Sequence, residues 1–125
     1  MRSVLLCLTA AMLVAGATIR PPTPTVAIET HMLPMRDGTR LATDVYLPSS
    51  PPPYPVILIR TPYDKNALKP IGEDGARRGC AVVIQDTRGR FASEGANLPF
   101  EGDGWWENRA DGVDKIGRAS CRERV

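Results

Sequence analysis

The 125 residues are 42% apolar and 24% charged, which is the composition of a globular domain rather than of a disordered chain. The length leaves room for one domain. The formal net charge is +2, but removing Arg2 with a signal peptide, and a carboxyl-terminal tail with three arginines and one glutamate, changes it to −1. A basic surface for nucleic acid is therefore not expected.

Residues 1–17 have the organisation of a secretory signal peptide. Arg2 supplies the positive start, Val4 to Val14 form the apolar segment, and Ala15-Gly16-Ala17 is a small-residue cleavage site. The apolar segment is shorter than the roughly 20 residues that span a bilayer. We expect cleavage after Ala17 and a secreted or periplasmic mature chain with no membrane attachment. Residues 18–25 then read as an extended Pro/Thr-rich linker.

The segment after the linker predicts an antiparallel hairpin. Apolar residues alternate with others over Val26 to Arg36 and again over Thr39 to Leu47, as in two strands. The Asp37-Gly38 pair between them is typical of a two-residue turn with positive φ angles. His31, the sole histidine of the sequence, is expected to be an ordinary residue of the first strand.

Two uninterrupted apolar runs predict the centre of the fold. Val56 to Arg60 and Cys80 to Gln85 lack alternation, as strands buried on both faces of a parallel sheet do. The stretch between them includes a short helix, expected at Gly72 to Arg78 after an interruption by Pro70, with Gly79 as its carboxyl cap. Strand, helix and strand would form one right-handed crossover, so the predicted fold class is α/β.

A long polar loop from Asp86 to Gly102 is expected after the second run. A helix follows over Asp103 to Lys115, with Trp105 and Trp106 in its first turns. We expect the genuine domain to cover residues 26–115.

The last ten residues are expected to be foreign. IGRASCRERV, residues 116–125, resembles the translation of a common sequencing-library adapter and breaks off the preceding helix. The alternative is a natural basic tail. If the signal peptide and this tail are removed, Cys7 and Cys121 go with them and leave Cys80 alone on a buried strand. No disulfide is then possible, and a lone buried cysteine acts as a small apolar residue.

Functional residues are expected where the two buried strands end, because ligands of open α/β sheets bind at the carboxyl ends of the strands. A tyrosine held there can donate its hydroxyl to an anion that develops during acyl transfer. The competing reading of Tyr63 is a ring that packs on the sheet and caps it. The residues at these ends are Thr61, Pro62, Tyr63 and Asp64 after the first strand, and Asp86, Thr87, Arg88 and Gly89 after the second.

The loop after the second strand contains charges and one serine. Asp86 can pair with Arg88 or Arg90 beneath the loop, which makes a structural loop a better reading than a phosphate site. Ser93 is rejected as a nucleophile because it lacks the preceding strand and the glycine spacing of a nucleophile elbow. No cofactor and no metal site is expected.

Taken together and in this order, the motifs resemble those of a known group of enzymes. The order of an MRDGTRLATDVYLP hairpin, PVILIRTPYDK, a crossover, CAVVIQDTRGRFASEG and DGWWENRADGVD resembles the amino-terminal part of the cocaine-esterase-like and X-Pro dipeptidyl-peptidase-like serine hydrolases. The resemblance covers roughly Val26 to Asp114. It implies an incomplete α/β-hydrolase sheet that belongs to an enzyme acting on small esters, amides or peptides.

By this resemblance, Tyr63 matches the side-chain oxyanion donor of the family. The nucleophilic serine of these enzymes lies in a Gly-x-Ser-x-Gly elbow on a later strand, and the acid and histidine of the triad follow it. None of the serines in this sequence has glycines two residues before and two residues after it. The chain by itself is therefore expected to be inactive.

The alternative from another class is a small secreted binding module. Trp105, Trp106 and Tyr63 would form its stacking surface. Adjacent helical residues point about 100° apart, so the two tryptophans make a poor shared platform, and one core and one surface residue is the simpler reading. The substrate and the oligomeric state cannot be read from these residues.

Overall fold

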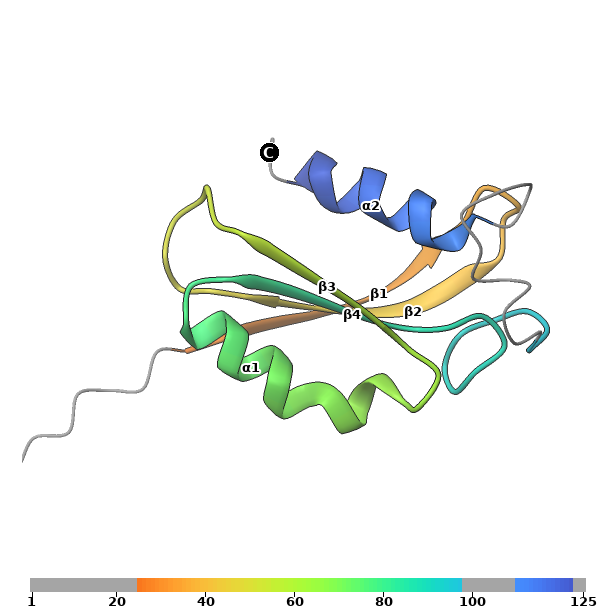
Figure 1. Cartoon of the computed structure of the whole chain (residues 1–125), viewed down its shortest axis with the longest axis horizontal. Coiled ribbons are helices and arrows are strands. Elements are labelled where there is room, and N and C mark those ends of the chain that lie inside the picture. The colour runs from red at the N-terminus through yellow and green to blue at the C-terminus, as the bar shows by residue number, and fades with distance from the viewer. Residues whose placement is uncertain (1–24, 98–109, 123–125) are drawn as a thin grey trace, which may run out of the picture.

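The computed structural model describes residues 25–97 and 110–122, with side chains described as far as residue 116. The predicted signal peptide, nearly all of the predicted linker, the two tryptophans and the last three residues lie outside this part. The described residues form four strands, two helices and a short 3-10 turn that leads into the first helix (Figure 1). No helix among the described residues is long and apolar enough to cross a membrane.

The predicted hairpin is present. Strands β1 (Ala27–Pro34) and β2 (Arg40–Leu47) pair antiparallel. The predicted two-residue turn is wrong, because the Met35 N–H donates to the Thr39 carbonyl (2.8 Å) and closes a loop with three residues inside it. Only Gly38 in this loop has a positive φ, 84°, which is the arrangement of a tight turn followed by a left-handed residue.

The predicted strand–helix–strand crossover is also present. Strands β3 (Val56–Thr61) and β4 (Ala81–Asp86) pair in parallel, β2 pairs with β4 antiparallel, and the order across the sheet is β1-β2-β4-β3. All six residues of β4 are buried. The prediction that β3 is buried on both faces is wrong, because β3 lies at the edge of the described sheet and leaves Ile57 43% exposed.

The crossover helix begins earlier than predicted. A 3-10 turn, η1 (Lys65–Leu68), leads into α1 (Lys69–Arg77). Pro70 was expected to interrupt the helix, but it lies in the first turn, where a missing N–H costs no hydrogen bond. The predicted cap is confirmed: Gly79 has φ 89° and donates to the Ala76 carbonyl, while Cys80 N–H reaches the Gly75 carbonyl (3.1 Å). Cys80 itself is half-buried rather than buried.

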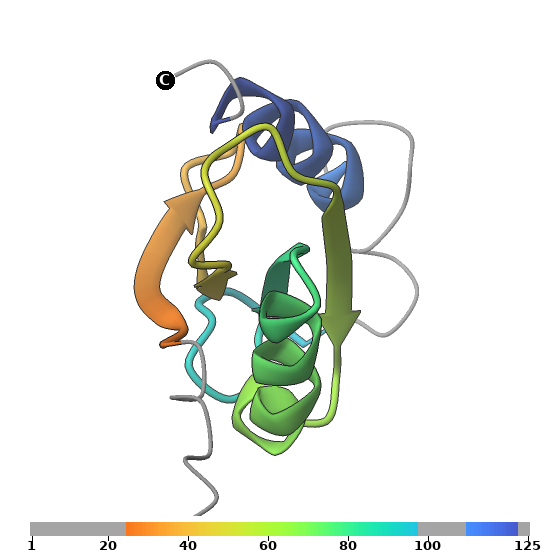
Figure 2. The ribbon, with the colours of Figure 1, turned by 90° about the vertical axis from the view of Figure 1, so that its left-hand side faces the viewer.

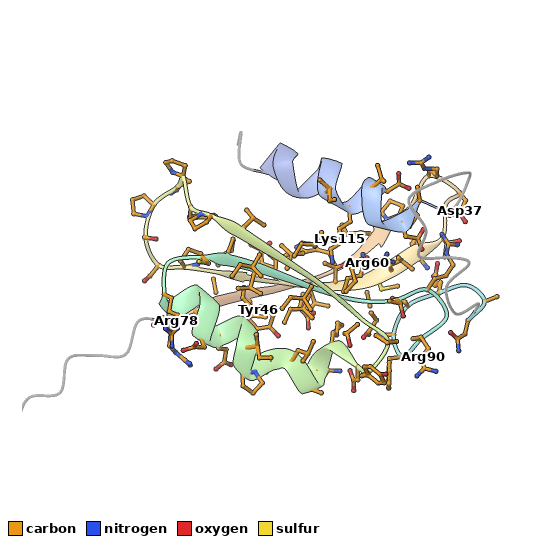
Figure 3. The ribbon with its side chains drawn as sticks, viewed as in Figure 1. Asp37, Tyr46, Arg60, Arg78, Arg90 and Lys115 are labelled. Atoms are coloured by element: carbon orange, nitrogen blue, oxygen red, sulfur yellow. The ribbon has the colours of Figure 1, made fainter. Side chains whose placement is uncertain are left out.

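The core lies between α1 and the sheet. Tyr46, Ala76, Val82 and Ile84 pack there, each at most 2% exposed. The ring of Tyr46, labelled in Figure 3, lies so close to Gly72 that a Cβ at that glycine would come within 2.6 Å of it. This close approach seats α1 on the sheet and thereby sets where the turn before it runs.

Helix α2 (Asp111–Arg122) lies on the opposite side of the sheet from α1 (Figures 1 and 2). The predicted start at Asp103 falls outside the described residues, and the predicted end at Lys115 is wrong because the helix continues to Arg122. The proposed foreign tail therefore does not break this helix.

Candidate functional site

Polar side chains gather at the end of the sheet where β3 and β4 finish. Because the two strands are parallel, their last residues, Thr61 and Asp86, lie opposite each other as register partners. The turn that carries Tyr63 follows β3, and the loop that begins at Thr87 follows β4. Figure 3 places Arg90 of this loop at the same end as Asp37 of the hairpin turn. The residues that the sequence placed at the ends of the two strands therefore lie at one end of the sheet.

Tyr63 is presented to solvent on a turn with a fixed backbone. Its side chain is 77% exposed, so the alternative of a ring packed on the sheet is not supported within the described residues. The Tyr63 N–H donates to Oγ1 of Thr61 (3.0 Å). Arg90 donates from Nε to the carbonyl of Pro62 (3.0 Å). These contacts hold the backbone on which the exposed Tyr63 side chain stands, and a phenolic hydroxyl can donate a hydrogen bond to a ligand.

A buried carboxylate lies beneath this turn. Asp86 is fully buried, and its Oδ1 accepts a hydrogen bond from the Lys65 N–H (2.7 Å). Burial raises the pKa of this carboxyl above its ordinary value, against the lowering effect of the Lys65 amide. The predicted pair of Asp86 with Arg88 or Arg90 is wrong, because the backbone amide takes the carboxylate and both arginines have other partners.

A second buried carboxylate anchors the same turn through its lysine side chain. Lys65 Nζ lies 2.9 Å from Oδ2 of Asp44 on β2, and both side chains are less than 10% exposed. The other oxygen of Asp44 accepts from the Thr30 hydroxyl (2.8 Å). Sequence analysis missed this pair, although the signal was present: Asp44 interrupts a strand whose other residues are mostly apolar.

The loop after β4 is held by Arg88. Its guanidinium donates to both oxygens of Asp111 at the start of α2 (3.0 and 2.6 Å), to both oxygens of Asp37 (2.7 and 3.2 Å) and to Oγ1 of Thr39 (2.7 Å). These carboxylates raise the pKa of Arg88 beyond its ordinary value. Arg88 thus ties the hairpin turn, the loop and α2 together. Asp37 had been interpreted only as a turn residue, and its second role was missed.

Further contacts seat α2 over the sheet. Arg36 donates from its backbone N–H and its side chain to Asp114 (2.5 to 3.1 Å). Arg60 of β3 lies 3.7 Å from Asp111 and donates to Gln85 Oε1 (3.2 Å). Lys115 is 1% exposed, and its Nζ has no hydrogen-bond partner among the described residues. Burial, with Arg60 nearby, lowers the pKa of Lys115 to about 6.

Ser93 and His31 have structural environments. The Ser93 hydroxyl donates to the Asp86 carbonyl (2.8 Å) and accepts from the Ala42 N–H (2.9 Å). It therefore joins the loop to the sheet, in keeping with its rejection as a nucleophile. His31 lies on β1 with Nε2 3.0 Å from Glu29, far from the Tyr63 turn in the chain. Among the described residues, no three His, Cys, Asp or Glu side chains are grouped as a metal site.

Acid should weaken the Arg88 cluster through Asp37. The hydrogen bond from Arg88 lowers the pKa of Asp37 from 3.8 to about 2. Since the folded-state pKa is the lower one, this carboxylate stabilises the fold above pH 4 and loses that contribution as the pH falls toward 2. We expect the urea midpoint of Asp37→Asn to depend less on pH across this window than the wild-type midpoint. Equal slopes for the two proteins would contradict this.

The residues of this site lie within a segment that matches a known protein family. The sequence pattern of the X-Pro dipeptidyl-peptidase (S15) family matches residues 37–117. The chain belongs to the X-Pro dipeptidyl-peptidase (S15) family. The match starts in the hairpin turn, includes Tyr63 and the Arg88 cluster, and ends in α2. This S15 chain is therefore part of a hydrolase family, as the sequence resemblance implied.

Two individual proteins that are similar to this chain are consistent with the family match. Cocaine esterase from Rhodococcus sp. (strain MB1 Bresler) is 50% identical over 78 residues, covering 58% of the S15 chain and 14% of the esterase. An alpha-amino acid ester hydrolase structure matches with a TM-score of 0.61 and 25% identity over 86% of the S15 chain and 22% of its own. The S15 chain thus spans less than a quarter of the length of these relatives.

The fold is that of part of an α/β-hydrolase. A CocE/NonD family hydrolase from Staphylococcus aureus superposes with a TM-score of 0.59 at 21% identity, over 78% of the S15 chain and 21% of the hydrolase. The chain therefore matches one portion of that larger hydrolase fold. The predicted incomplete α/β-hydrolase fold is confirmed.

Proposed function

We propose that this chain is the amino-terminal part of a secreted serine hydrolase that cleaves an ester or amide bond by acyl transfer. The observation that carries the proposal is Tyr63: it is exposed at the carboxyl end of a parallel strand, inside the segment that matches the S15 family. Secretion rests on the signal-like residues 1–17. The substrate class, a small ester, amide or peptide, is supported by the relatives named above.

The chemical role of Tyr63 follows from where charge develops. When a serine attacks a carbonyl carbon, the carbonyl oxygen becomes an anion, and a hydroxyl already aimed at that position stabilises it. Tyr63 would donate this hydrogen bond beside a backbone N–H next to the nucleophile. A histidine would take the proton of the serine, and an acid would orient the histidine. Those three residues would come from sequence beyond the 125 residues, so this chain alone should not turn over substrate.

The test uses the complete gene. Long-read sequencing across the codons for Asp114 to Val125 would show whether the reading frame continues in place of the proposed adapter-derived residues 116–125. If these ten residues and a stop codon are confirmed, the tail is natural and the proposal of a truncated hydrolase is overturned. The complete protein should react with a fluorophosphonate probe at one serine of a Gly-x-Ser-x-Gly elbow, and the 125-residue chain should not react. Labelling should be found in the periplasm or medium. A complete protein that resists the probe would overturn the assignment as a serine hydrolase.

A further inference from the structure

The turn that carries Tyr63 is held on both sides by one pair of side chains. Thr61 and Asp86 are the last register partners of β3 and β4. Thr61 accepts from the N–H of Tyr63 itself (3.0 Å), and Asp86 accepts from the N–H of Lys65, two residues further on (2.7 Å). The ends of two neighbouring strands therefore accept hydrogen bonds from the backbone at Tyr63 and two residues after it.

The backbone between these two contacts has an uncommon conformation. Asp64 has φ 72°, a left-handed value that residues other than glycine rarely adopt without support. Its own carboxylate accepts from the Asn66 N–H (2.9 Å), which closes the turn on the far side. Such a conformation persists where the surrounding structure determines it strongly, and it is frequent at functional sites. The Thr61 and Asp86 contacts are the ones that the ends of β3 and β4 make to the backbone of this turn.

The chemistry of Asp86 fits a positioning role. Its side chain is completely buried, and its second oxygen lies 3.5 Å from the Ala92 N–H in the loop after β4. Keeping a carboxylate away from water is costly, and a plain structural acceptor would not need the charge. A charged acceptor makes a shorter and stronger hydrogen bond to a backbone N–H than a neutral one does. The Lys65 amide is thus held more tightly than an ordinary turn amide.

Packing cannot orient Tyr63 within the described residues. Tyr63 is 77% exposed, so among the described residues the position of the backbone is what limits the region that its hydroxyl can reach. A displacement of about 1 Å at a catalytic group can cost on the order of 10² in rate. We propose that Thr61 and Asp86 are positioning residues that aim the Tyr63 hydroxyl at the developing oxyanion, an inference that rests on the proposed function of Tyr63.

The experiment is a double-mutant cycle in the complete hydrolase. The concentration of active enzyme is measured by titration with the fluorophosphonate probe, and kcat is calculated from that concentration. Thr61→Val and Asp86→Ala should each lower kcat by about 10- to 100-fold with little change in KM, because the lost stabilisation exists only in the transition state. In the Tyr63→Phe background, the same substitutions should change kcat by no more than about twofold, because contacts that act through one group are not additive.

Two variants separate positioning from general damage. Asp86→Asn keeps an oxygen for the Lys65 N–H but loses the charge, so it should restore part of the kcat lost in Asp86→Ala. Thr43→Val is the matched control: Thr43 is a fully buried threonine on β2 whose hydroxyl contacts Gln85 and Leu41, and the substitution should leave kcat unchanged. If Asp86→Ala does not fold, Thr61→Val and its cycle with Tyr63→Phe still decide the question.

The outcomes distinguish two failures. If Tyr63→Phe lowers kcat but the losses from Thr61→Val and Asp86→Ala persist in full in that background, the positioning role is overturned and the oxyanion role of Tyr63 stands. If Tyr63→Phe leaves kcat unchanged, the oxyanion role falls and the positioning role falls with it. Strong coupling of both residues to Tyr63, with rescue by Asp86→Asn, supports the proposal.

Discussion

Replacing Tyr63 with phenylalanine in the complete hydrolase is expected to lower kcat by about 10²- to 10³-fold, the usual cost of removing one oxyanion donor. The substitution removes one hydroxyl and keeps the ring. KM should change little, because a neutral carbonyl oxygen in the bound substrate needs this donor much less than the anion does. Since Tyr63 is 77% exposed, stability should stay within about 0.5 kcal/mol of the wild type.

Steady-state kinetics with a chromogenic ester would measure this loss. The control is Tyr54→Phe, which makes the same change in the proline-rich loop that precedes β3, at the opposite end of that strand. Tyr54→Phe should keep full activity. Unchanged turnover in Tyr63→Phe would remove Tyr63 from the mechanism, and a loss confined to KM would make it a substrate-binding residue instead.

Arg88→Ala is expected to have the largest effect on stability, a loss of about 3–5 kcal/mol, which is the typical cost of removing one partner of a buried ion pair. The reason lies mainly with Asp111. Its side chain is 1% exposed and accepts two hydrogen bonds from Arg88, so the substitution leaves a buried carboxylate without its strongest donor. Asp37 and Thr39 would lose the same partner.

Urea unfolding followed by circular dichroism would measure this loss. Arg88→Lys should recover only part of the stability, because an ammonium cannot donate to two carboxylates in the paired geometry of a guanidinium. Arg78→Ala is the control: Arg78 also forms an ion pair, with Asp74, but both side chains are more than half exposed, and its removal should not measurably shift the midpoint. A wild-type midpoint in Arg88→Ala would show that the cluster does not stabilise the fold.

Local patterns predicted the elements well because their causes are local. The apolar run Val56 to Arg60, the alternation before Leu47 and the cap at Gly79 each depend on residues a few positions apart. The wrong predictions concern where a helix begins and how deeply a strand is buried. Pro70 was read as an interruption when it begins a helix, and β3 was read as buried when it is an edge strand. Which strand lies at the edge of a sheet depends on neighbours distant in sequence.

For the candidate site, too, some features could be predicted from the sequence and others only from the structure. The sequence by itself determined the parallel pair of strands, the place of Tyr63 just past one of them, and the family, because strand-end motifs and their order are written along the chain. The exposure of Tyr63 was decided by the structure, because the sequence had left open a ring packed on the sheet. Only the tertiary structure decided the partners: Arg88 with Asp37 and Asp111, and Asp86 with the Lys65 amide. Burial makes charged groups take the strongest available donor or acceptor, and folding alone determines which of these lie within reach.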